Sequence, residues 1–450
     1  MCDKKVDYNE ILMGINTKVK TFDNKIIRAI NFDNAATTPP FKSVIDKIIK
    51  LSEYYGSIGR GAGHKSEMTT YIYHESKKYL MNFFNIKDKN KYIVIYVNNT
   101  TDGINKLARI LPRKKDDIVL LTRMEHHSND LPWRKNFNVD YVEVDEEGRL
   151  KIDEFEKKFK EHKGKIKYVS VTGASNVTGY LNDIHKIAEI AHKYKSKIIV
   201  DGAQLVPHKK VDMWGKGKDS IDFLVFSGHK LYAPFGGGAI IGLKKVFEEG
   251  ITDDEGGGTV NIVMDNWIEY LSSPEKNEAG TPNYFGAVSI VEALKTLDKI
   301  GFHNIHKHEI ILRDRLFEGL KAIPKVFNYG DMEKYDDRLG IGVFNIEYLY
   351  HQMVAEELAK IYGVSVRQGW FCAHPYCRRL MHISEKTTTN FIYDKRVKMP
   401  GMIRVSFGIY NSKEEVDYFL EAVEKISKDF SWKKELFINL TAPKFIIFIL

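Results

Sequence analysis

The stretch Ile221-Asp-Phe-Leu-Val-Phe-Ser-Gly-His-Lys-Leu-Tyr-Ala-Pro-Phe-Gly-Gly-Gly238 decides the fold. Its apolar run, residues 223–226, is typical of a buried strand and stops abruptly at Ser-Gly-His-Lys. A lysine at the mouth of such a strand is poorly solvated, so the amine of Lys230 can be neutral near pH 7 and react with an aldehyde. Taken alone, such a lysine is more often a strand-end charge that reaches solvent.

A carboxylate at the end of another apolar run favours the reactive interpretation. This run, Lys197-Ile-Ile-Val-Asp201, precedes the first one in the chain. Enzymes that use pyridoxal phosphate (PLP) need a lysine to hold the aldehyde and a carboxylate to keep the pyridine nitrogen protonated. Lys230 and Asp201 together predict a PLP site.

Five segments share one pattern, in which a β-branched apolar run is followed at once by small or polar residues. They are residues 92–97, 118–121, 168–171, 198–200 and 223–226. Helical patterns lie between several of them, such as residues 181–192, which are apolar at i, i+3, i+4 and i+7. This alternation predicts an α/β fold with a mostly parallel, doubly wound sheet, whose ligands bind beyond the carboxyl ends of the strands.

The chain of 450 residues is too long for one compact core, so we expect two domains. We predict a large domain at 31–299 and a smaller α+β domain at 1–30 and 300–432. The smaller domain has candidate strands at 340–346 and 402–407 and a candidate helix at 413–426. Residues 384–400 are polar and predict a surface loop. The apolar C-terminal tail, 433–450, receives no function, and the strongly apolar run at its end, 445–450, is too short to span a bilayer.

Composition narrows the function classes. Apolar residues make up 43% of the chain and charged residues 28%, and the net charge of +8 is not concentrated in a basic tract. We therefore expect no nucleic-acid or membrane role. The three cysteines are too few for a disulfide scaffold and the N-terminus lacks a signal-peptide pattern, so we expect a cytoplasmic protein.

Seven short stretches, in this order and spacing, resemble the class V aminotransferase family of fold-type I PLP enzymes, and most closely its SufS-like (group II) cysteine desulfurases. They are Asn31-Phe-Asp-Asn-Ala-Ala-Thr-Thr38, Glu125-His-His-Ser-Asn129, Ser175-Asn-Val-Thr-Gly179, Asp201-Gly-Ala-Gln204, Ser227-Gly-His-Lys230, Glu255-Gly-Gly-Gly258 and Glu278-Ala-Gly-Thr-Pro-Asn283. The resemblance covers roughly residues 30 to 430 and implies a large PLP-binding domain with a smaller C-terminal domain.

The phosphate of PLP has a candidate seat at Thr100-Thr101-Asp102-Gly103. This turn opens a predicted helix, whose free N–H groups and dipole favour an anion. The alternative is a threonine that only caps the helix. Ser227 and His229 would add donors. Thr281 resembles the family residue that reaches the phosphate from the other subunit, which implies a homodimer.

Other residues are placed on the cofactor by the resemblance. Asp201 pairs with the pyridinium nitrogen, and Gln204 can hydrogen-bond the 3′ oxygen of the ring. His126 resembles the imidazole that stacks on the ring and relays protons, although a single histidine is also compatible with a surface or core position. Asn176 resembles the residue near the ring and the substrate carboxylate.

The substrate end is predicted in the second domain. Arg404 matches the family's carboxylate-binding arginine. Arginine suits this task because its guanidinium pairs with a carboxylate bidentately. Arg367 and Arg60 are weaker members of the same site. In Arg367-Gln-Gly-Trp-Phe-Cys372, the family pattern Arg-x-Gly-x-x-Cys makes Cys372 the sulfur acceptor, whereas a small buried hydrophobe is the ordinary alternative.

The sequence also departs from the family pattern. Trp370-Phe371 stand where SufS-like proteins usually carry histidine or other polar residues, which affects substrate choice more than cofactor use. A metal interpretation competes locally, but the spacing of the four candidate ligands is not a common zinc pattern, and we predict no metal. These candidates are Cys372, His374, Cys377 and His382.

The resemblance implies that L-cysteine is converted to L-alanine while its sulfur passes to Cys372 as a persulfide. A sulfur-acceptor or iron–sulfur scaffold protein would then take the persulfide sulfur. Three alternatives stay open: a selenocysteine lyase, a class V aminotransferase or epimerase that does not use Cys372, and a non-catalytic partner that keeps the fold.

Overall fold

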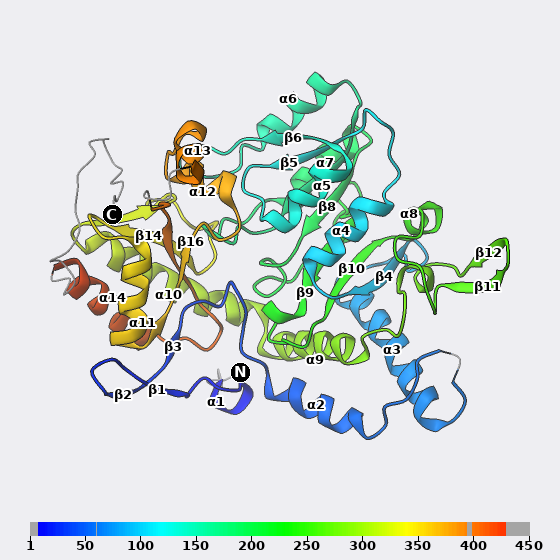
Figure 1. Ribbon diagram of the computed structural model, residues 1–450, viewed down its shortest axis with the longest axis horizontal. Helices are drawn as coiled ribbons and strands as arrows, with labels where there is room; N and C mark the ends of the chain where they lie inside the picture. Colours follow the sequence, from blue (N-terminus) through cyan, green and yellow to red (C-terminus); the bar gives the residue numbers. More distant parts are fainter. Residues whose placement is uncertain (1–7, 60, 394–397, 429–450) are drawn as a thin grey trace.

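A seven-stranded sheet organises the larger part of the molecule in this computed structural model, which describes residues 8–59, 61–393 and 398–428 (Figure 1). The strand order is β4-β10-β9-β8-β7-β5-β6, and β10 runs antiparallel to both of its neighbours while the other pairs are parallel. The strands are β4 (Tyr92–Val97), β5 (Ile118–Thr122), β6 (Asn138–Val142), β7 (Ile166–Thr172), β8 (Lys197–Asp201), β9 (Phe223–Ser227) and β10 (Gly238–Leu243).

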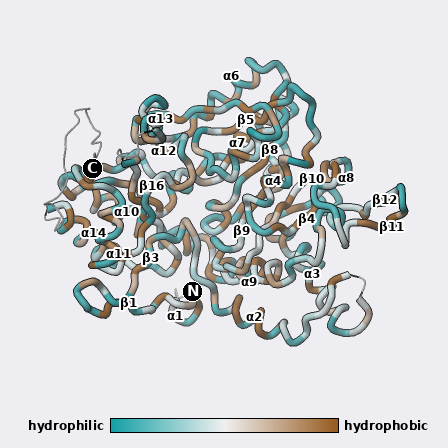
Figure 2. Tube along the Cα trace, in the orientation of Figure 1, coloured by the Kyte–Doolittle hydropathy of each residue, from teal (hydrophilic) through white to brown (hydrophobic). Residues whose placement is uncertain are grey.

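The predicted mostly parallel α/β sheet is confirmed, and each of the five apolar runs forms one of its strands. Every residue of β4, β5, β9 and β10 is buried. Side chains alternate between the two faces of a strand, so helices must cover both faces. Figure 2 shows the hydrophobic stretches of these central strands. The associated helices are α2 (Lys42–Ser52), α3 (His64–Phe83), α4 (Thr100–Ile110), α5 (Leu131–Asn136), α6 (Asp153–His162), α7 (Ile184–Lys193), α8 (Lys244–Glu249) and α9 (Tyr284–Ile300).

The carboxyl ends of the parallel strands lie side by side. Thr172 of β7 is in register with Asp201 of β8, and Asp201 is in register with Val225 of β9. The antiparallel strand β10 starts beside these ends, where a Cβ at Gly238 would come within 2.8 Å of Asn99 Cα. Only glycine allows this close approach to the start of α4.

A four-stranded antiparallel sheet, in the order β13-β14-β17-β16, lies on the left in Figure 1 with α10, α11 and α14. It has its own apolar core, which includes Leu316, Phe344 and Phe419. Its elements are α10 (Phe302–Ala322), β13 (Val326–Tyr329), β14 (Ile341–Ile346), α11 (His351–Tyr362), β16 (Arg367–Gly369), α12 (His374–Leu380), β17 (Met402–Ser406) and α14 (Lys413–Lys428). The exact domain boundaries at 30, 300 and 432 stay a prediction.

Short elements complete the described chain. The parallel pair β3–β15 joins the N-terminal segment to the second sheet region, and two hairpins, β1–β2 and β11–β12, stand apart from both sheets. These elements are α1 (Tyr8–Ile11), β1 (Lys18–Lys20), β2 (Ile26–Arg28), β3 (Ile30–Asn31), η1 (His127–Asn129), η2 (Gly228–Lys230), β11 (Val260–Met264), β12 (Trp267–Tyr270), η3 (Glu275–Asn277) and β15 (Val364–Ser365).

The predicted surface loop at 384–400 is wrong in its first half. Residues Glu385–Tyr393 form helix α13, and the Ser384 hydroxyl accepts the Thr387 N–H over 3.0 Å, which caps its first turn. The apolar tail at 433–450 lies outside the described residues. Within the described ranges, no helix combines the length and hydropathy that crossing a membrane requires.

Candidate active site

Twelve of the predicted site residues line one pocket of about 790 Å³, at the carboxyl ends of β7, β8 and β9 and facing the second sheet. They are Thr100, Thr101, His126, Asn176, Asp201, Gln204, Ser227, His229, Lys230, Arg367, Cys372 and Arg404. Thr281 is exposed and does not line this pocket. Arg60 lies outside the described residues.

Lys230 ends the short 3-10 turn η2, directly after β9. Its amine makes no hydrogen bond or ion pair with any described residue. Burial lowers the pKa of Lys230 to about 8, with Arg404 and Arg367 acting in the same direction and Asp201 and Cys372 against it. An appreciable fraction of the amine is therefore neutral at physiological pH and able to act as a nucleophile.

Asp201, the last residue of β8, is buried at the pocket floor. One carboxylate oxygen accepts the Ala203 N–H over 2.9 Å, and no other described residue hydrogen-bonds this side chain. Burial raises the pKa of Asp201, while the Ala203 N–H and the nearby Lys230 lower it. The carboxylate thus keeps an oxygen for a cationic N–H in the pocket.

The residues of the predicted anion seat lie at the N-terminus of α4. The Thr100 N–H donates to Ser227 Oγ over 2.7 Å, and the two hydroxyls of these residues lie 2.7 Å apart. The Thr101 N–H has no partner among the described residues. The helix is capped by Asn99, whose side chain accepts the Asp102 N–H, so capping does not explain the two threonines.

Helix α4 can approach the sheet closely because of Gly103. A Cβ at this position would come within 2.6 Å of Val225 Cγ1. The glycine therefore lets the helix N-terminus lie over the end of β9, beside Ser227 and Lys230.

His126 presents a neutral imidazole to the pocket. Its Nδ1 accepts the Ser128 N–H over 3.1 Å, so the ring proton lies on Nε2. Burial lowers the pKa of His126 to about 3, and the nearby Lys230 adds to the effect. The Gln204 side chain is oriented by a hydrogen bond in which its Nε2 donates to the Ala35 carbonyl over 2.6 Å.

His229 lies in η2, directly before Lys230, and its ring is close to Thr37 of the N-terminal segment. Burial lowers its pKa to about 4, and Lys230 contributes in the same direction. Its Nδ1 is 3.4 Å from Thr37 Oγ1. A neutral imidazole here can donate one hydrogen bond to an anion without adding a full charge.

A buried carboxylate, Glu125, supports the turn that carries His126. Its Oε1 accepts the Thr122 hydroxyl over 2.6 Å and the Thr172 N–H over 3.1 Å, and its Oε2 accepts the Asn129 amide over 2.7 Å. Burial raises the pKa of Glu125 to about 8, against the three hydrogen bonds, which lower it. This network joins the ends of β5 and β7 to η1.

Arg404 comes from β17 of the second sheet and is buried. Its Nη1 donates to the Asn176 carbonyl over 2.8 Å, and its Nη2 to Asp33 Oδ1 over 2.9 Å. The guanidinium carbon lies 5.2 Å from the Phe371 ring centroid, and the buried Nε has no hydrogen-bond partner in the described part of the chain.

Asp33 also binds Arg367, whose Nε lies 3.2 Å from Asp33 Oδ2. The sequence interpretation missed Asp33 as a site residue, although it lies within the quoted stretch 31–38. Its pairing with Arg404 joins residues that are 371 positions apart, which no local pattern reveals.

Cys372 lies in the connection between β16 and α12, with its thiol exposed in the pocket. Two successive non-glycine residues have left-handed backbones here, Phe371 at φ +48° and Cys372 at φ +54°. The Asn176 side chain donates to the Phe371 carbonyl over 2.8 Å, and the His127 N–H donates to the Cys372 carbonyl over 2.7 Å. The ordinary alternative for Cys372, a small buried hydrophobe, is therefore wrong.

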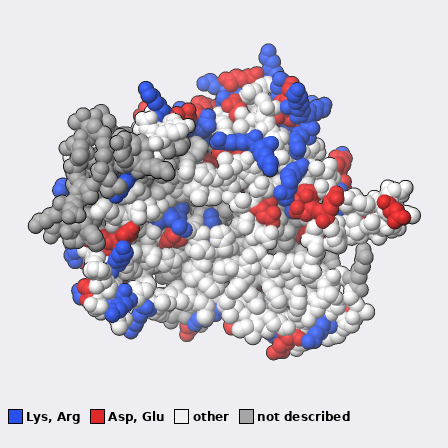
Figure 3. All heavy atoms as spheres, viewed as in Figure 1, with Lys and Arg blue, Asp and Glu red and all other residues white. Residues whose placement is uncertain are grey.

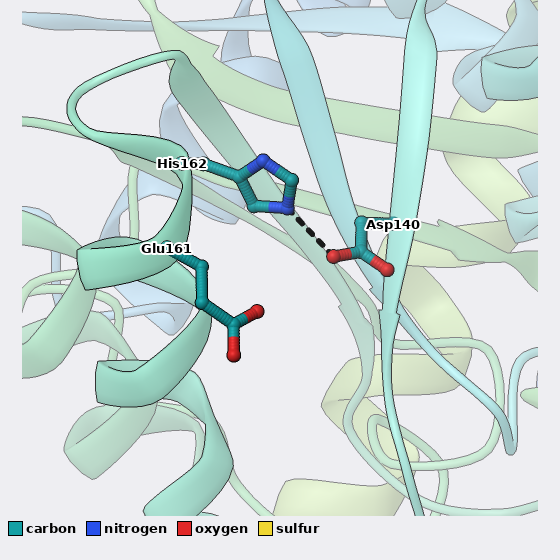
Figure 4. A group of neighbouring side chains, drawn as sticks. All are labelled: Asp140, Glu161 and His162. Carbon is teal, nitrogen blue, oxygen red and sulfur yellow. Dashed lines mark hydrogen bonds and ion pairs between the residues drawn. The ribbon is translucent and has the colours of Figure 1, made fainter.

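The four metal-ligand candidates around Cys372 do not come together. Cys377 is buried with its thiol donating to the Trp370 carbonyl over 3.1 Å, whereas His374 lines the pocket. The group of potential ligands that does converge in the described part of the chain is Asp140, Glu161 and His162 (Figure 4). Asp140 Oδ2 already accepts from His162 Nε2 over 2.7 Å and from Lys158 Nζ over 2.9 Å, so a protein cation neutralises it.

Comparison with known proteins places the chain that forms this pocket in a family. The model of the aminotransferase class-V family matches residues 30–419. A probable cysteine desulfurase of Pyrococcus abyssi is 34% identical over 411 residues, 89% of this chain and 94% of the relative. A probable cysteine desulfurase of Borreliella burgdorferi is 32% identical over 427 residues, 92% of this chain and 94% of the relative. The apo structure of a cysteine desulfurase from Thermococcus onnurineus has a TM-score of 0.79 and 30% identity, covering 89% of this chain and 95% of that one.

The chain belongs to the class-V aminotransferase family, and it is a PLP-dependent enzyme of fold type I. The pocket suits this cofactor on its own chemistry. Within the described residues, it contains an unpaired, half-buried amine at Lys230, a carboxylate oxygen without a partner at Asp201 and an unpartnered N–H at Thr101. These groups match an aldehyde, a pyridinium N–H and a phosphate.

Proposed function

We propose that the protein is a PLP-dependent cysteine desulfurase that converts L-cysteine to L-alanine and takes the sulfur onto Cys372. One observation carries this proposal: the exposed thiol of Cys372 lines the same pocket as Lys230 and Arg404. Transamination needs an amine and a carboxylate anchor but no thiol. The names of the relatives favour the same activity.

Each residue has a defined task in this reaction. When bound, PLP supplies an electron sink that stabilises negative charge on the substrate Cα. Arg404 binds the substrate carboxylate, and Asp201 holds the proton of the ring nitrogen. The neutral fraction of the Lys230 amine, which burial increases by lowering its pKa to about 8, accepts the Cα proton. His126, with its proton on Nε2, provides a neutral donor above the pocket floor.

Sulfur transfer is a nucleophilic step at Cys372. The thiolate of Cys372 attacks the substrate sulfur, the Cβ–S bond breaks and a proton is added at Cβ. The overall change is L-cysteine plus enzyme thiol giving L-alanine plus enzyme persulfide, so no external oxidant or reductant is required. A second thiol must then remove the outer sulfur, and we propose a sulfur-acceptor or iron–sulfur scaffold protein for that role.

We propose that the enzyme acts as a homodimer. Exposed apolar side chains on the β11–β12 hairpin support this, with Val263 62%, Met264 60% and Trp267 52% exposed. The hairpin projects from the body in Figure 1, and the face over α9 carries few charged side chains in Figure 3. Thr281, which lies outside its own pocket, would then reach the phosphate seat of the second copy.

We also propose a reducing, cytoplasmic location, because a reactive thiol such as Cys372 must stay reduced to accept sulfur. The two described cysteines, Cys372 and Cys377, are both unpaired.

The test is to incubate the holoenzyme with L-cysteine and dithiothreitol and to measure alanine and sulfide together. The wild type should release the two in equal amounts. Cys372→Ser should release neither while it keeps the absorbance of the bound cofactor. Cys377→Ala, which removes the buried thiol seven residues after Trp370, is the matched control and should stay active.

Three outcomes would change the assignment. Sulfide release by Cys372→Ser would remove the desulfurase mechanism. Amino transfer to an added 2-oxo acid would indicate an aminotransferase. A much higher kcat/KM for L-selenocysteine than for L-cysteine would make the protein a selenocysteine lyase.

A further inference from the structure

His127 contacts the Cys372 segment at two points, the carbonyl of Cys372 itself and the N–H of His374. Its backbone N–H donates to the Cys372 carbonyl over 2.7 Å. Its ring Nε2 accepts the His374 N–H over 3.2 Å. One residue of η1 therefore holds the two peptide groups that flank Ala373.

The Cys372 segment needs such support because its backbone is strained. The left-handed φ values of Phe371 and Cys372, +48° and +54°, are uncommon for residues other than glycine. Such conformations persist only where the surroundings hold them. Asn176 holds the Phe371 carbonyl, and His127 holds the next two anchoring points.

Ring packing fixes the orientation of the His127 side chain. Its ring contacts the His374 ring edge-on with centroids 4.5 Å apart, and His374 contacts Trp370 in the same way at 5.1 Å. Burial lowers the pKa of His127, so Nε2 remains an unprotonated acceptor at neutral pH. The neighbouring His126 faces the pocket floor beside Lys230, which ties the cofactor side of the pocket to the thiol side.

We propose that His127 is a positioning residue that holds the Cys372 thiol in its attacking position through the acceptor at ring Nε2. The proposal rests on the proposed desulfurase function. It assigns His127 no contact with the cofactor or substrate.

A matched pair of substitutions isolates the acceptor atom. The Gln side-chain oxygen can occupy the position of His Nε2, so His127→Gln keeps an acceptor for the His374 N–H. The Asn side chain is one carbon shorter and ends near the position of Nδ1, so His127→Asn loses it. The hydrogen bond from the backbone N–H of residue 127 to the Cys372 carbonyl remains in both variants.

The experiment uses each holoenzyme without reductant and measures the rate of the first turnover of L-alanine from L-cysteine. A misplaced nucleophile typically slows such a step by about 10- to 100-fold, and we expect that loss for His127→Asn. KM for L-cysteine should change by no more than about twofold, because substrate binding does not use the thiol. His127→Gln should recover to within about threefold of wild type.

A second measurement separates positioning from general damage. Exchange of the Cα hydrogen of L-alanine with deuterium oxide uses the cofactor and Lys230 but no thiol, and it should be unchanged in His127→Asn. A first-turnover rate of His127→Asn equal to that of the wild type would overturn the proposal. A Cα-hydrogen exchange rate that falls in this variant as much as its first-turnover rate would also overturn it. Equal losses in the Asn and Gln variants would also overturn it.

The two proposals fail differently. If the wild type forms no alanine from L-cysteine, the desulfurase function fails. If the wild type forms alanine and His127→Asn does so at the same rate, only the positioning role fails.

Discussion

The Arg404 guanidinium donates to Asp33 Oδ1 over 2.9 Å, so this buried cation of the pocket has an acidic partner in the protein itself. The second oxygen of Asp33 pairs with Arg367. Asp33 therefore balances two guanidinium groups that come from neighbouring strands, β16 and β17. In the proposed function, a substrate carboxylate would approach Arg404 beside this pair and its Nε, which has no hydrogen-bond partner among the described residues.

Asp33→Asn should destabilise the fold. The substitution leaves the buried Arg404 charge without a counter-charge, and breaking such a pair costs about 3 kcal/mol of unfolding free energy. Urea unfolding of the holoenzyme measures the change. Asp23→Asn, which breaks the fully exposed pair with Lys25, is the control and should leave the midpoint unchanged. Equal midpoints for wild type and Asp33→Asn would contradict this role.

Arg404→Gln should raise KM for L-cysteine about 100-fold, because a charged bidentate contact with the carboxylate is replaced by a neutral one. Cysteamine, which lacks the carboxylate, provides the control substrate. Its slow turnover should be the same in wild type and variant. A similar loss with both substrates would show that Arg404 supports the fold rather than the carboxylate.

The capture of PLP by the apo-protein should depend on pH through Lys230. Burial lowers the pKa of this amine to about 8, so the neutral, reactive form increases as the pH rises through that value and predominates above it. Stopped-flow absorbance should give a capture rate with a midpoint near pH 8. A free lysine analogue, measured in parallel, should titrate near its ordinary value of about 10.4. Equal midpoints for the apo-protein and the free lysine analogue would contradict the claim that burial lowers the pKa of Lys230.

Glu125→Gln should disturb the turn that carries His126. Above its pKa of about 8, the ionised side chain accepts three hydrogen bonds, whereas an amide would place its own N–H groups against one of these donors, so the two proteins are compared above this pKa. An unsatisfied buried donor costs about 1–3 kcal/mol. We expect a lower midpoint in urea unfolding together with slower turnover. Loss of activity with unchanged stability would instead point to a direct chemical role for Glu125.

Local patterns in the sequence were sufficient to predict most of the large sheet and the polar residues that gather in one pocket at its strand ends, whose roles toward PLP stay predictions. The parallel strands are buried on both faces, so they read as continuous apolar runs with polar residues at their carboxyl ends. Asp201, Ser227 and Lys230 are found at these ends because ligand sites in such sheets occur there.

Features that depend on distant contacts were not predictable in the same way. The reversed strand β10 has a glycine-rich sequence without a direction signal, and its antiparallel pairing is set by β4 and β9. Helix α13 lacks an apolar stripe, so residues 385–393 resembled a loop. Asp33 pairs with Arg404, and His127 hydrogen-bonds the Cys372 segment. Both partners lie in the second sheet region, hundreds of residues further along the chain.

The most direct test of the account is the mass of the Cys372 peptide after a single turnover. Holoenzyme is mixed with one equivalent of sulfur-labelled L-cysteine without reductant and then digested under non-reducing conditions. The account predicts one equivalent of L-alanine and a Cys372 peptide heavier by one labelled sulfur atom, with the Cys377 side chain unmodified. Formation of alanine with an unmodified Cys372 would contradict the central claim.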